Sequence, residues 1–453
     1  MSLLLDALPF LMFAALVPLL FTGYPVAFVL GGTGLLFWAI AVMLGAENPQ
    51  SFFLVVSRIF GGVVEKPVLI AVPMFVLMGT LLARSGIADD LLRVLDRLTR
   101  RVPGGLALSV TLLGVVLAAT TGIIGASVVM MTLMALPMMR AAGYDTGLAT
   151  GTIAASGTLG ILLPPSIMLV VMADLLSMSA GTLFMAAIGP GLLLAGFYML
   201  YLLITALFRP HLTPPHGEDA AEPVRPKTIL TALLPPVGLI ALVLGSIFGG
   251  IATPTEASGV GAFGALLLAL ARRRLSLSGL RGAVESSALT TIMIFGLFVG
   301  ATAFSYVFTL LGGHDHILAL MNTDGSGAWL VLGVLMLATF LLGFFFDWIE
   351  ITLILLPVFA PVITALDFGG HVPPGTMTTA WFAMLMAVNL QTSFLTPPFG
   401  FALFYMKGAA PGDVRLATIY RGIVPFVALQ ALALLVLALF PNLALWLPRL
   451  LAE

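Results

Sequence analysis

The chain has 453 residues, of which 60% are hydrophobic and only 9% are charged, and its formal net charge is −1. Soluble globular domains carry about 25% charged residues, so the composition excludes a chain whose surface is mostly in contact with water. The near-neutral charge argues against nucleic acid as a partner. The absence of cysteine excludes disulfides and thiol chemistry.

Apolar runs of about 20 residues, the length that a helix needs to cross the hydrocarbon core of a bilayer, recur along the chain. They are continuous rather than alternating, so they predict an all-α polytopic membrane protein and not a β-barrel. The first ten residues include Asp6 and no basic residue, which predicts a first membrane helix rather than a cleaved signal peptide. We expect spans at 7–22, 26–45, 67–84, 182–208, 228–250, 255–271, 283–311 and 418–440.

Basic residues in short connections predict the orientation, because they favour the cytoplasmic side of a membrane. Segments 245–254, 312–327 and 367–377 contain no Lys or Arg and are expected outside. The basic clusters expected in the cytoplasm are Arg93, Arg97, Arg100 and Arg101; Arg140; Arg209, Arg225 and Lys227; Arg272, Arg273, Arg274 and Arg281; and Lys407, Arg415 and Arg421.

Two cytoplasmic segments have their own character. The stretch from Asp89 to Arg101 places leucines on one face, which predicts a helix lying along the membrane surface. It is either an arm that links a moving domain to a fixed one or a surface helix with no mechanical role. Residues 209–227 are proline-rich and charged, and they predict a linker between two halves of the chain.

Landmarks recur between these halves in the same order, which predicts an internal repeat rather than chance similarity. Val64-Glu65 opens a segment that reaches Pro137, and Val284-Glu285 opens one that reaches Pro357, each 220 residues further on. Pro25 precedes Gly31-Gly32 as Pro254 precedes Gly259 and Gly261, and Pro164-Pro165 corresponds to Pro397-Pro398.

Each half contains an apolar segment with a polar or glycine-bearing middle. Segment 104–141 has basic residues at both ends, so two half-length helices joined at 118–127 would return to the cytoplasm as a re-entrant hairpin. Segment 327–366 has non-basic ends, and its hairpin, with a tip at 343–350, would enter from outside. Equivalent hairpins that enter from opposite faces define an inverted repeat, a common plan of secondary transporters.

A helix with a double proline follows each hairpin, at 155–166 and at 389–400. Two adjacent prolines remove two N–H donors and leave earlier carbonyls without partners, at a cost of several kcal/mol each in hydrocarbon. Sodium can bind such carbonyls and nearby hydroxyls, and the helix that restarts after the prolines points a positive dipole at an anion. Tolerated proline kinks are the alternative, but polar flanks in both halves favour a binding site.

The candidate residues for substrate and sodium binding follow from these tips and breaks. They are Thr120, Thr121, Gly122, Gly125, Ser127, Ser156, Gly157, Thr158, Gly160, Pro164, Pro165, Ser166, Gly343, Asp347, Asn389, Thr392, Ser393, Thr396, Pro397, Pro398 and Gly400. Because no Lys or Arg lies in a tip or break, an anion would be held by helix termini and hydroxyls. Individual sodium ligands are not assigned.

Two acids near the second tip have alternative roles. A carboxylate at membrane depth is costly and therefore a functional candidate, so Asp347 is expected to handle a cation or a proton, and Glu350 less so. Alternatively, both lie at the outer water interface or cap the second half-helix. The chain has no Walker loop, catalytic triad or metalloprotease helix, so we expect neither direct use of ATP nor an enzyme. We expect no cofactor other than sodium as coupling ion.

Several strings in this order resemble the large membrane subunit, DctM type, of tripartite ATP-independent periplasmic (TRAP) transporters. They are Pro73 to Gly79, Leu163 to Ser166, Gly189-Pro190-Gly191, Ala252 to Ala257 and Leu395 to Gly400. The first tip, Thr121 to Ser127, differs from the Ser-Gly-Ser tip common in members for sialic acid and C4-dicarboxylates. It is similar to the branch labelled mannitol/chloroaromatic or 2-oxo acid, which argues against sialic acid or succinate.

The resemblance implies sodium-driven uptake of a small organic acid across the bacterial inner membrane, from a periplasmic binding protein. It also implies a small four-helix membrane subunit, and an elevator domain that contains both hairpins and both broken helices. The sodium region would fall on the first tip, Ser156 to Ser166 and Asn389 to Gly400. A stand-alone sodium/anion symporter of similar fold is the alternative, and an intramembrane enzyme or a channel is a third hypothesis.

This plan divides the chain into five parts. Residues 1–103 hold scaffold helices and the amphipathic arm, 104–181 the first half of the transport domain, 182–326 further scaffold helices with the linker, 327–410 the second half of the transport domain, and 411–453 a C-terminal helix.

Overall fold

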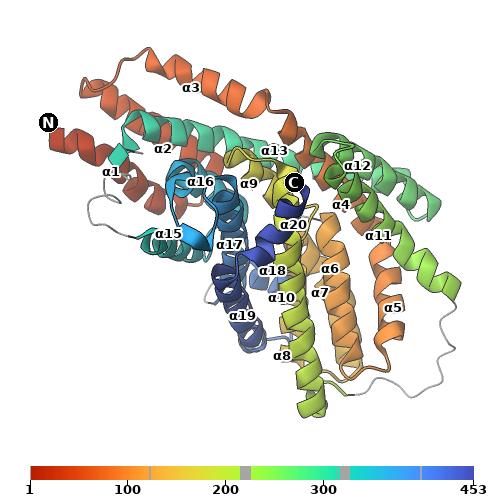
Figure 1. The fold of residues 1–453 in the computed structure, drawn as a ribbon. Coiled ribbons are helices and arrows are strands. Elements are labelled where there is room, and N and C mark those ends of the chain that lie inside the picture. Colours follow the sequence, from red (N-terminus) through yellow and green to blue (C-terminus); the bar gives the residue numbers. More distant parts are fainter. Residues whose placement is uncertain are drawn as a thin grey trace.

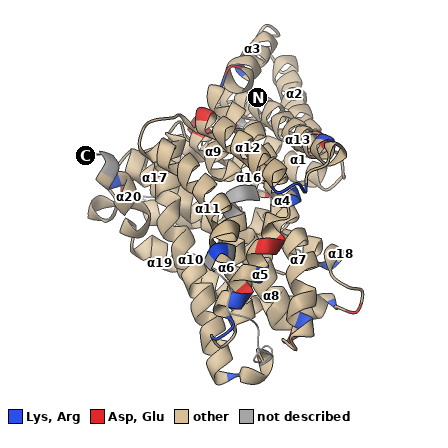
Figure 2. Cartoon of the chain, turned by 90° about the vertical axis from the view of Figure 1, so that its right-hand side faces the viewer, with Lys and Arg blue, Asp and Glu red and all other residues tan. Residues whose placement is uncertain are grey.

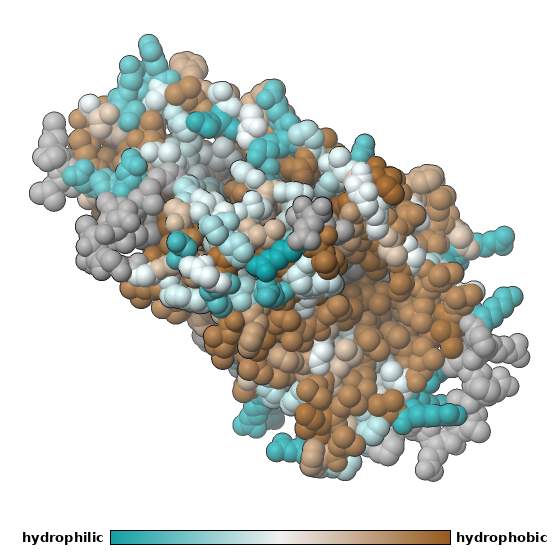
Figure 3. Space-filling model, viewed as in Figure 1, coloured by the Kyte–Doolittle hydropathy of each residue, from teal (hydrophilic) through white to brown (hydrophobic). Residues whose placement is uncertain are grey.

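The computed structural model describes residues 2–121, 124–214, 226–313, 315–316, 327–397 and 400–452. Within these residues every regular element is a helix, and nine helices are long and apolar enough to cross a membrane. The face in Figure 3 has a broad continuous hydrophobic area over its lower half, with hydrophilic residues above it and at its lower ends. The prediction of an all-α polytopic membrane protein is confirmed.

The helices follow the expected order (Figure 1). The N-terminal part contains α1 (Ser2–Leu20), α2 (Val26–Met43), α3 (Ser51–Ile59) with a π-helical turn (Phe60–Val64), a 3₁₀ turn (Pro67–Ile70), α4 (Ala71–Arg84) and α5 (Ile87–Thr99). The first hairpin-and-break unit, here called the first unit, contains α6 (Gly105–Thr121), α7 (Ile124–Ala141), α8 (Thr146–Thr158), a 3₁₀ turn (Leu159–Ile161) and α9 (Ile167–Leu175).

The second half of the chain repeats this succession. The middle part contains α10 (Ala180–Phe208), a 3₁₀ turn (Pro210–Leu212), α11 (Pro226–Phe248), α12 (Pro254–Ala271) and α13 (Leu277–Leu310). The second unit contains α15 (Ala328–Leu342), α16 (Trp348–Ala365), a 3₁₀ turn (Gly369–His371), α17 (Thr376–Leu395) and α18 (Phe401–Ala409), and α19 (Leu416–Leu439) and α20 (Asn442–Ala452) complete the chain. Each half therefore has two neighbouring helices followed by an interrupted one.

Helix starts follow local chemistry. The Asp145 carboxylate accepts a hydrogen bond from the Leu148 N–H at 2.8 Å and so caps α8. At α12, Thr253 and Glu256 form a reciprocal capping box, and Pro254 occupies the first helical position, where its missing N–H costs nothing. These caps fix where the spans begin.

Long helix pairs build the body of the protein. Helix α13 packs along α2, α12 packs along α4, and α19 packs along α8. In Figure 1, α1, α2 and α13 run across the upper part of the molecule, and α6, α7, α8, α10 and α19 run at a steep angle to them. Charged residues are sparse and lie largely in connections and near helix ends (Figure 2), as a hydrocarbon environment requires.

The surface stretch expected from Asp89 to Arg101 forms helix α5, and its apolar face is buried against α6 and α11. Asp90 accepts from Arg272 at 2.7 Å and from Arg274 at 3.4 Å, so α5 is tied to the connection between α12 and α13. The helix is confirmed, whereas a role as a mechanical arm stays a prediction.

The structure differs from the sequence expectation at three places. Segment 411–453 holds two helices rather than one, because Pro441 cannot continue the backbone ladder of α19. Helix α3 was not among the expected spans, because its nine residues are too short to cross a bilayer. The linker contains the turn Pro210–Leu212, and its residues 215–225 lie outside the described part.

Candidate functional site

The first hairpin is formed by α6 and α7, which pack on each other and on α8. Gly125 and Ser127, at the start of α7, are buried. Gly122 and the side chains of Thr120 and Thr121 lie outside the described residues. The hairpin itself is present, and its return to the same face of a membrane stays a prediction.

The second hairpin is formed by α15 and α16, joined through 343–347. The Asp347 carboxylate accepts from the Trp348 N–H at 2.7 Å, and the Glu350 carboxylate accepts from the Asp347 N–H at 3.2 Å. Together they cap α16 as a capping box. The contacts of Asp347 and Glu350 are therefore those of the alternative in which both residues cap the second half-helix. Cation or proton handling by Asp347 stays a prediction.

The first broken helix is interrupted where the sequence predicts. Helix α8 ends at Thr158, the chain makes one 3₁₀ turn that contains Gly160, and α9 begins at Ile167 after the cis bond between Pro164 and Pro165. Every residue from 147 to 173 is buried. The interruption lies inside protein, where irregular backbone can be satisfied by neighbouring groups rather than by lipid.

A hydroxyl bridges this break. Pro165 would, as an ordinary residue, donate its N–H to the Ile161 carbonyl four residues earlier. Instead, the Ser166 Oγ donates to that carbonyl at 2.6 Å. Ser156 donates to Thr111 at 3.3 Å, which fastens α8 to α6 ahead of the break.

The second broken helix stops at Leu395. Thr396 is extended, and its Oγ1 donates back to the Thr392 carbonyl at 2.7 Å. Gly400 has φ +50, and a Cβ there would lie 2.9 Å from the end of the Leu403 side chain, so glycine is favoured before α18 begins. Pro398 lies outside the described residues, and Pro397 is half-buried.

The structure brings the tips and breaks of both units together. The Gln391 Nε2 of α17 donates to the Thr158 Oγ1 of α8 at 3.1 Å, and both side chains are buried. A Cβ at Gly125 would lie 2.9 Å from the ring of Tyr405 in α18, and one at Gly343 would overlap Ser393 in α17. The first tip therefore contacts the helix after the second break, and the second tip contacts the helix before it.

Within α8, Gly157 allows the same closeness to the first hairpin. A Cβ at Gly157 would lie 2.7 Å from Val128 Cγ2 and 3.2 Å from Val128 Cα in α7. At the base of this hairpin, Arg140 forms two hydrogen bonds, at 3.2 and 2.5 Å, with the exposed Asp413 after α18. The hydrogen bond from Arg140 holds the pKa of the Asp413 carboxyl below its usual value.

Most polar groups near the breaks have backbone partners. The Asn389 Nδ2 donates to the Met336 carbonyl of α15 at 2.6 Å, and Thr392 and Ser393 donate to carbonyls within α17. The Gln391 Oε1 is different, because it is buried and has no hydrogen-bond partner within the described residues. An unpaired buried acceptor is costly, which makes this oxygen a candidate ligand for a cation.

Gln391 was not named individually from the sequence, although it lies in the stretch Asn389 to Gly400 to which the resemblance assigns the sodium region. Its signal was an amide six residues before Pro397 in an otherwise apolar segment. Within the described residues, no three His, Cys, Asp or Glu side chains gather as a metal site.

The family model for the DctM component of tripartite ATP-independent periplasmic transporters matches residues 13–443. The chain belongs to the DctM family. The resemblance found in the sequence is therefore confirmed, and this DctM-family chain is a multi-pass membrane protein of a transporter class.

Curated relatives cover most of this DctM-family chain. The ectoine TRAP transporter large permease protein TeaC of Halomonas elongata is 29% identical over 96% of this chain and 98% of its own length. The C4-dicarboxylate TRAP transporter large permease protein DctM of Pseudomonas aeruginosa is 30% identical over 85% of this chain and 87% of its own. The ectoine/5-hydroxyectoine TRAP transporter large permease protein UehC of Ruegeria pomeroyi is 32% identical over 84% of this chain and 85% of its own length. These relatives are permeases rather than enzymes.

Two solved structures share the fold of this family member. The YdaH transporter of Alcanivorax borkumensis has a TM-score of 0.62 at 16% identity, and covers 97% of this chain and 98% of its own. MtrF of Neisseria gonorrhoeae has a TM-score of 0.55 at 14% identity, and the match covers 88% of this chain and 84% of MtrF. At this identity the likeness concerns the fold alone.

Proposed function

We propose that this DctM-family chain takes up a small organic acid across the bacterial inner membrane, driven by a sodium gradient. The contact between Gln391 and Thr158 carries the proposal, because it joins the two broken helices in the buried interior and leaves one amide oxygen unpaired. Sodium is a hard cation that prefers oxygen ligands, and the breaks supply carbonyls and hydroxyls at the same place.

The anion has a separate rationale. Helices α9 and α18 each restart directly after a break, so their first N–H groups have no partners in the preceding turn. No basic side chain lies in either break, and helix N-termini attract negative charge without one. A carboxylate is the group that we propose for these termini.

The packing of the tips and breaks supports an elevator mechanism. Because each hairpin tip contacts a helix of the second break, the two units would move as one body against α1 to α4 and α11 to α13. Following the family, we propose that a periplasmic binding protein delivers the acid and that a small four-helix membrane subunit packs against this chain. The solutes named for the relatives differ, so the proposal extends only to a small organic acid.

Uptake by proteoliposomes tests the proposal. The chain is reconstituted with the small subunit, and the solute is the acid that co-purifies with the binding protein, identified by mass spectrometry. We expect accumulation only with an inward sodium gradient and the binding protein, and no effect of ATP.

The outcomes separate the alternatives. Sodium-dependent uptake by this chain alone would support a stand-alone symporter and contradict the requirement for a binding protein. Uptake that does not depend on the sodium gradient would reject sodium coupling. Passive equilibration without accumulation would indicate a channel.

A further inference from the structure

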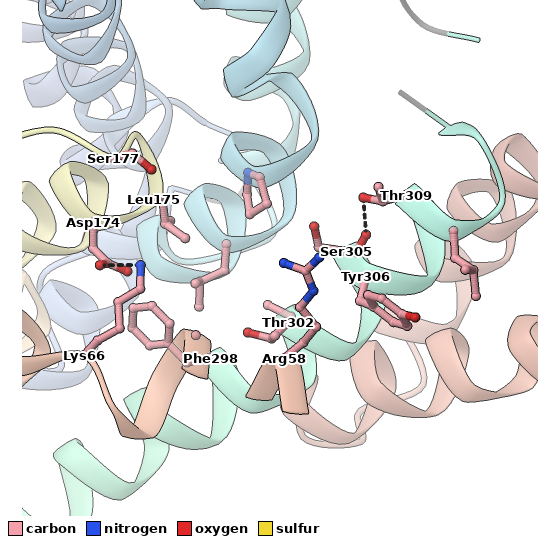
Figure 4. Close-up of a pocket in the computed structure, with 15 residues that line it drawn as sticks. Arg58, Lys66, Asp174, Leu175, Ser177, Phe298, Thr302, Ser305, Tyr306 and Thr309 are labelled. Carbon is pink, nitrogen blue, oxygen red and sulfur yellow. Dashed lines mark hydrogen bonds and ion pairs between the residues drawn. The ribbon is translucent and has the colours of Figure 1, made fainter. Parts of the chain in front are cut away.

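A polar pocket lies apart from the helix breaks, between the segment that leads into α4 and the ends of α9 and α13 (Figure 4). Its volume is about 400 Å³, within the range of sites for small ligands. Hydroxyls of Thr302, Ser305 and Tyr306 line one side, and Phe298 and Leu353 provide apolar wall. The pocket can therefore accept a molecule with a polar head and a carbon skeleton.

The helices that end at this pocket indicate its face of the membrane. Lys66 lies just before one span, whose other end, at Arg84, is next to the basic helix α5. Similarly, α13 has Arg281 near its start and ends at Leu310, which lines the pocket. The pocket thus lies at the helix ends opposite to the arginine clusters. By the positive-inside rule it faces outside.

Two basic residues in this pocket depart from that rule. Arg58 and Lys66 project into the same space, Lys66 towards Asp174 (Figure 4). The Lys66 Nζ lies 2.8 Å from the Asp174 Oδ1, and the Asp174 side chain is only 7% exposed, so the two charges neutralise each other. Arg58 makes no hydrogen bond or salt bridge with any described residue, and the Glu47 carboxylate acts from outside the lining on Tyr306, as Arg58 does. Among the residues that line the pocket, one positive charge is therefore in excess.

We propose that the Arg58 pocket binds the carboxylate of a small organic acid at the outer face, ahead of the helix breaks. For its ligand class the proposal rests on the proposed function. A guanidinium binds a carboxylate through two parallel N–H donors, and the one positive charge in excess among the lining residues matches one carboxylate. The hydroxyls of Thr302 and Tyr306 supply further donors, and Lys66 with Asp174 forms a neutral wall.

The absence of cysteine from the chain allows a direct test of the charge. Ser305→Cys places a single thiol in the pocket, and its reaction rates with an anionic and a cationic methanethiosulfonate reagent are compared. Adding Arg58→Gln should lower the ratio of anionic to cationic rates by about fivefold or more, the effect of one unit charge at close range in water. Arg421→Gln, which removes a charge outside the pocket, should leave the ratio unchanged. An unchanged ratio in Arg58→Gln would overturn the proposal.

A protection experiment identifies the ligand. Labelling of Ser305→Cys in phosphatidylcholine nanodiscs is measured with pyruvate, succinate or benzoate, and with the uncharged amide of each. When Arg58 is present, we expect at least one of the acids, and none of the amides, to slow the labelling. In the Arg58→Gln variant, we expect none of these compounds to slow it. If none of the acids protects, the proposal fails. The labelling is repeated in nanodiscs that contain phosphatidylglycerol. If this anionic lipid slows labelling and none of the acids does, the pocket binds a lipid phosphate and the proposal is likewise overturned.

The labelling needs neither a sodium gradient nor transport, so its failure is distinguishable from failure of the proposed function. Protection without sodium-driven uptake would keep the pocket and reject the coupling. Sodium-driven uptake without protection would reject the pocket alone.

Discussion

The pairs Pro164-Pro165 and Pro235-Pro236 lie in two membrane-length segments with different outcomes. Helix α8 ends before the first pair, and a single 3₁₀ turn, Leu159–Ile161, precedes the irregular stretch that lasts until α9 starts at Ile167. Helix α11 continues through the second pair from Pro226 to Phe248. A proline pair alone therefore does not unwind a membrane helix.

The surroundings account for the difference. Only 22% of the residues in the span Ile229–Phe248 of α11 are buried in protein, so an unwound segment there would find few protein groups to satisfy its backbone. The first break is buried throughout. In each case a donor reaches a carbonyl that a proline has freed: Ser166 donates to Ile161 in the break, and Arg272 donates to Thr231 in α11 at 2.5 Å. At the first break, the prolines thus act together with a buried protein interior that satisfies the backbone.

The largest expected effect comes from filling the close contact of the broken helix. Gly157→Ala would press against Val128, including its backbone, and should destabilise the protein by about 1–3 kcal/mol. The measurement is the thermal unfolding midpoint in detergent. Gly238→Ala in α11 is the control, because a Cβ there meets nothing within 4 Å. Equal midpoints for the two variants would show that the break is loosely packed.

Restoring the missing donors should reduce sodium affinity. Pro164→Ala with Pro165→Ala lets α8 extend, so that carbonyls near the break return to helix hydrogen bonds. The sodium concentration for half-maximal uptake should rise about tenfold, or about 1.4 kcal/mol. Pro235→Ala with Pro236→Ala supplies the comparison and should change it less than twofold. A similar response of both double variants would mean that the first break is only a kink.

The unpaired amide oxygen should matter next. Gln391→Leu removes both the contact with Thr158 and the free Oε1, and should raise the half-maximal sodium concentration about fivefold, or about 1 kcal/mol. Gln430→Leu is a matched control, because Gln430 is also buried, donates to Tyr198 at 2.7 Å and has an unpaired Oε1. Loss of sodium affinity in Gln430→Leu but not in Gln391→Leu would contradict the assignment.

The smallest expected effect concerns the hydroxyl that bridges the break. Ser166→Ala leaves the Ile161 carbonyl unpaired and should destabilise the protein by about 1 kcal/mol, read from the unfolding midpoint. Ser246→Ala in α11 removes a similar hydrogen bond to Val243, 2.8 Å long, from a half-buried site and should cost less. If Ser246→Ala were the more damaging change, the bridge would not stabilise the break.

The positions of the membrane spans were predictable because each span corresponds to one long, continuous apolar stretch of the sequence. The expected span 182–208 corresponds to α10, and 255–271 corresponds to α12, within two residues at either end. The two breaks were also predicted, but the prolines were an incomplete reason, as α11 shows. What distinguished the true breaks was the polar composition around them, which the sequence displays.

The remaining features depend on contacts between distant segments. Thr158 and Gln391 are 233 residues apart, and Lys66 and Asp174 are 108 residues apart, so no local pattern announces either pair. The roles of Asp347 and Glu350 were left open because a capping box and an ion-handling site use the same residue types. Only the distances to the Trp348 and Asp347 N–H groups show the capping contacts.

The Arg272 side chain joins three helices at one point. It pairs with Asp90 of α5 and donates to Thr231 of α11, from the end of its own helix, α12. A displacement of α5 would therefore pull on α11 one turn before Pro235, where the prolines leave the fewest internal hydrogen bonds to resist bending. Of these three helices, α11 is therefore the one expected to bend most easily, at its proline pair, while Arg272 keeps it joined to α5 and α12.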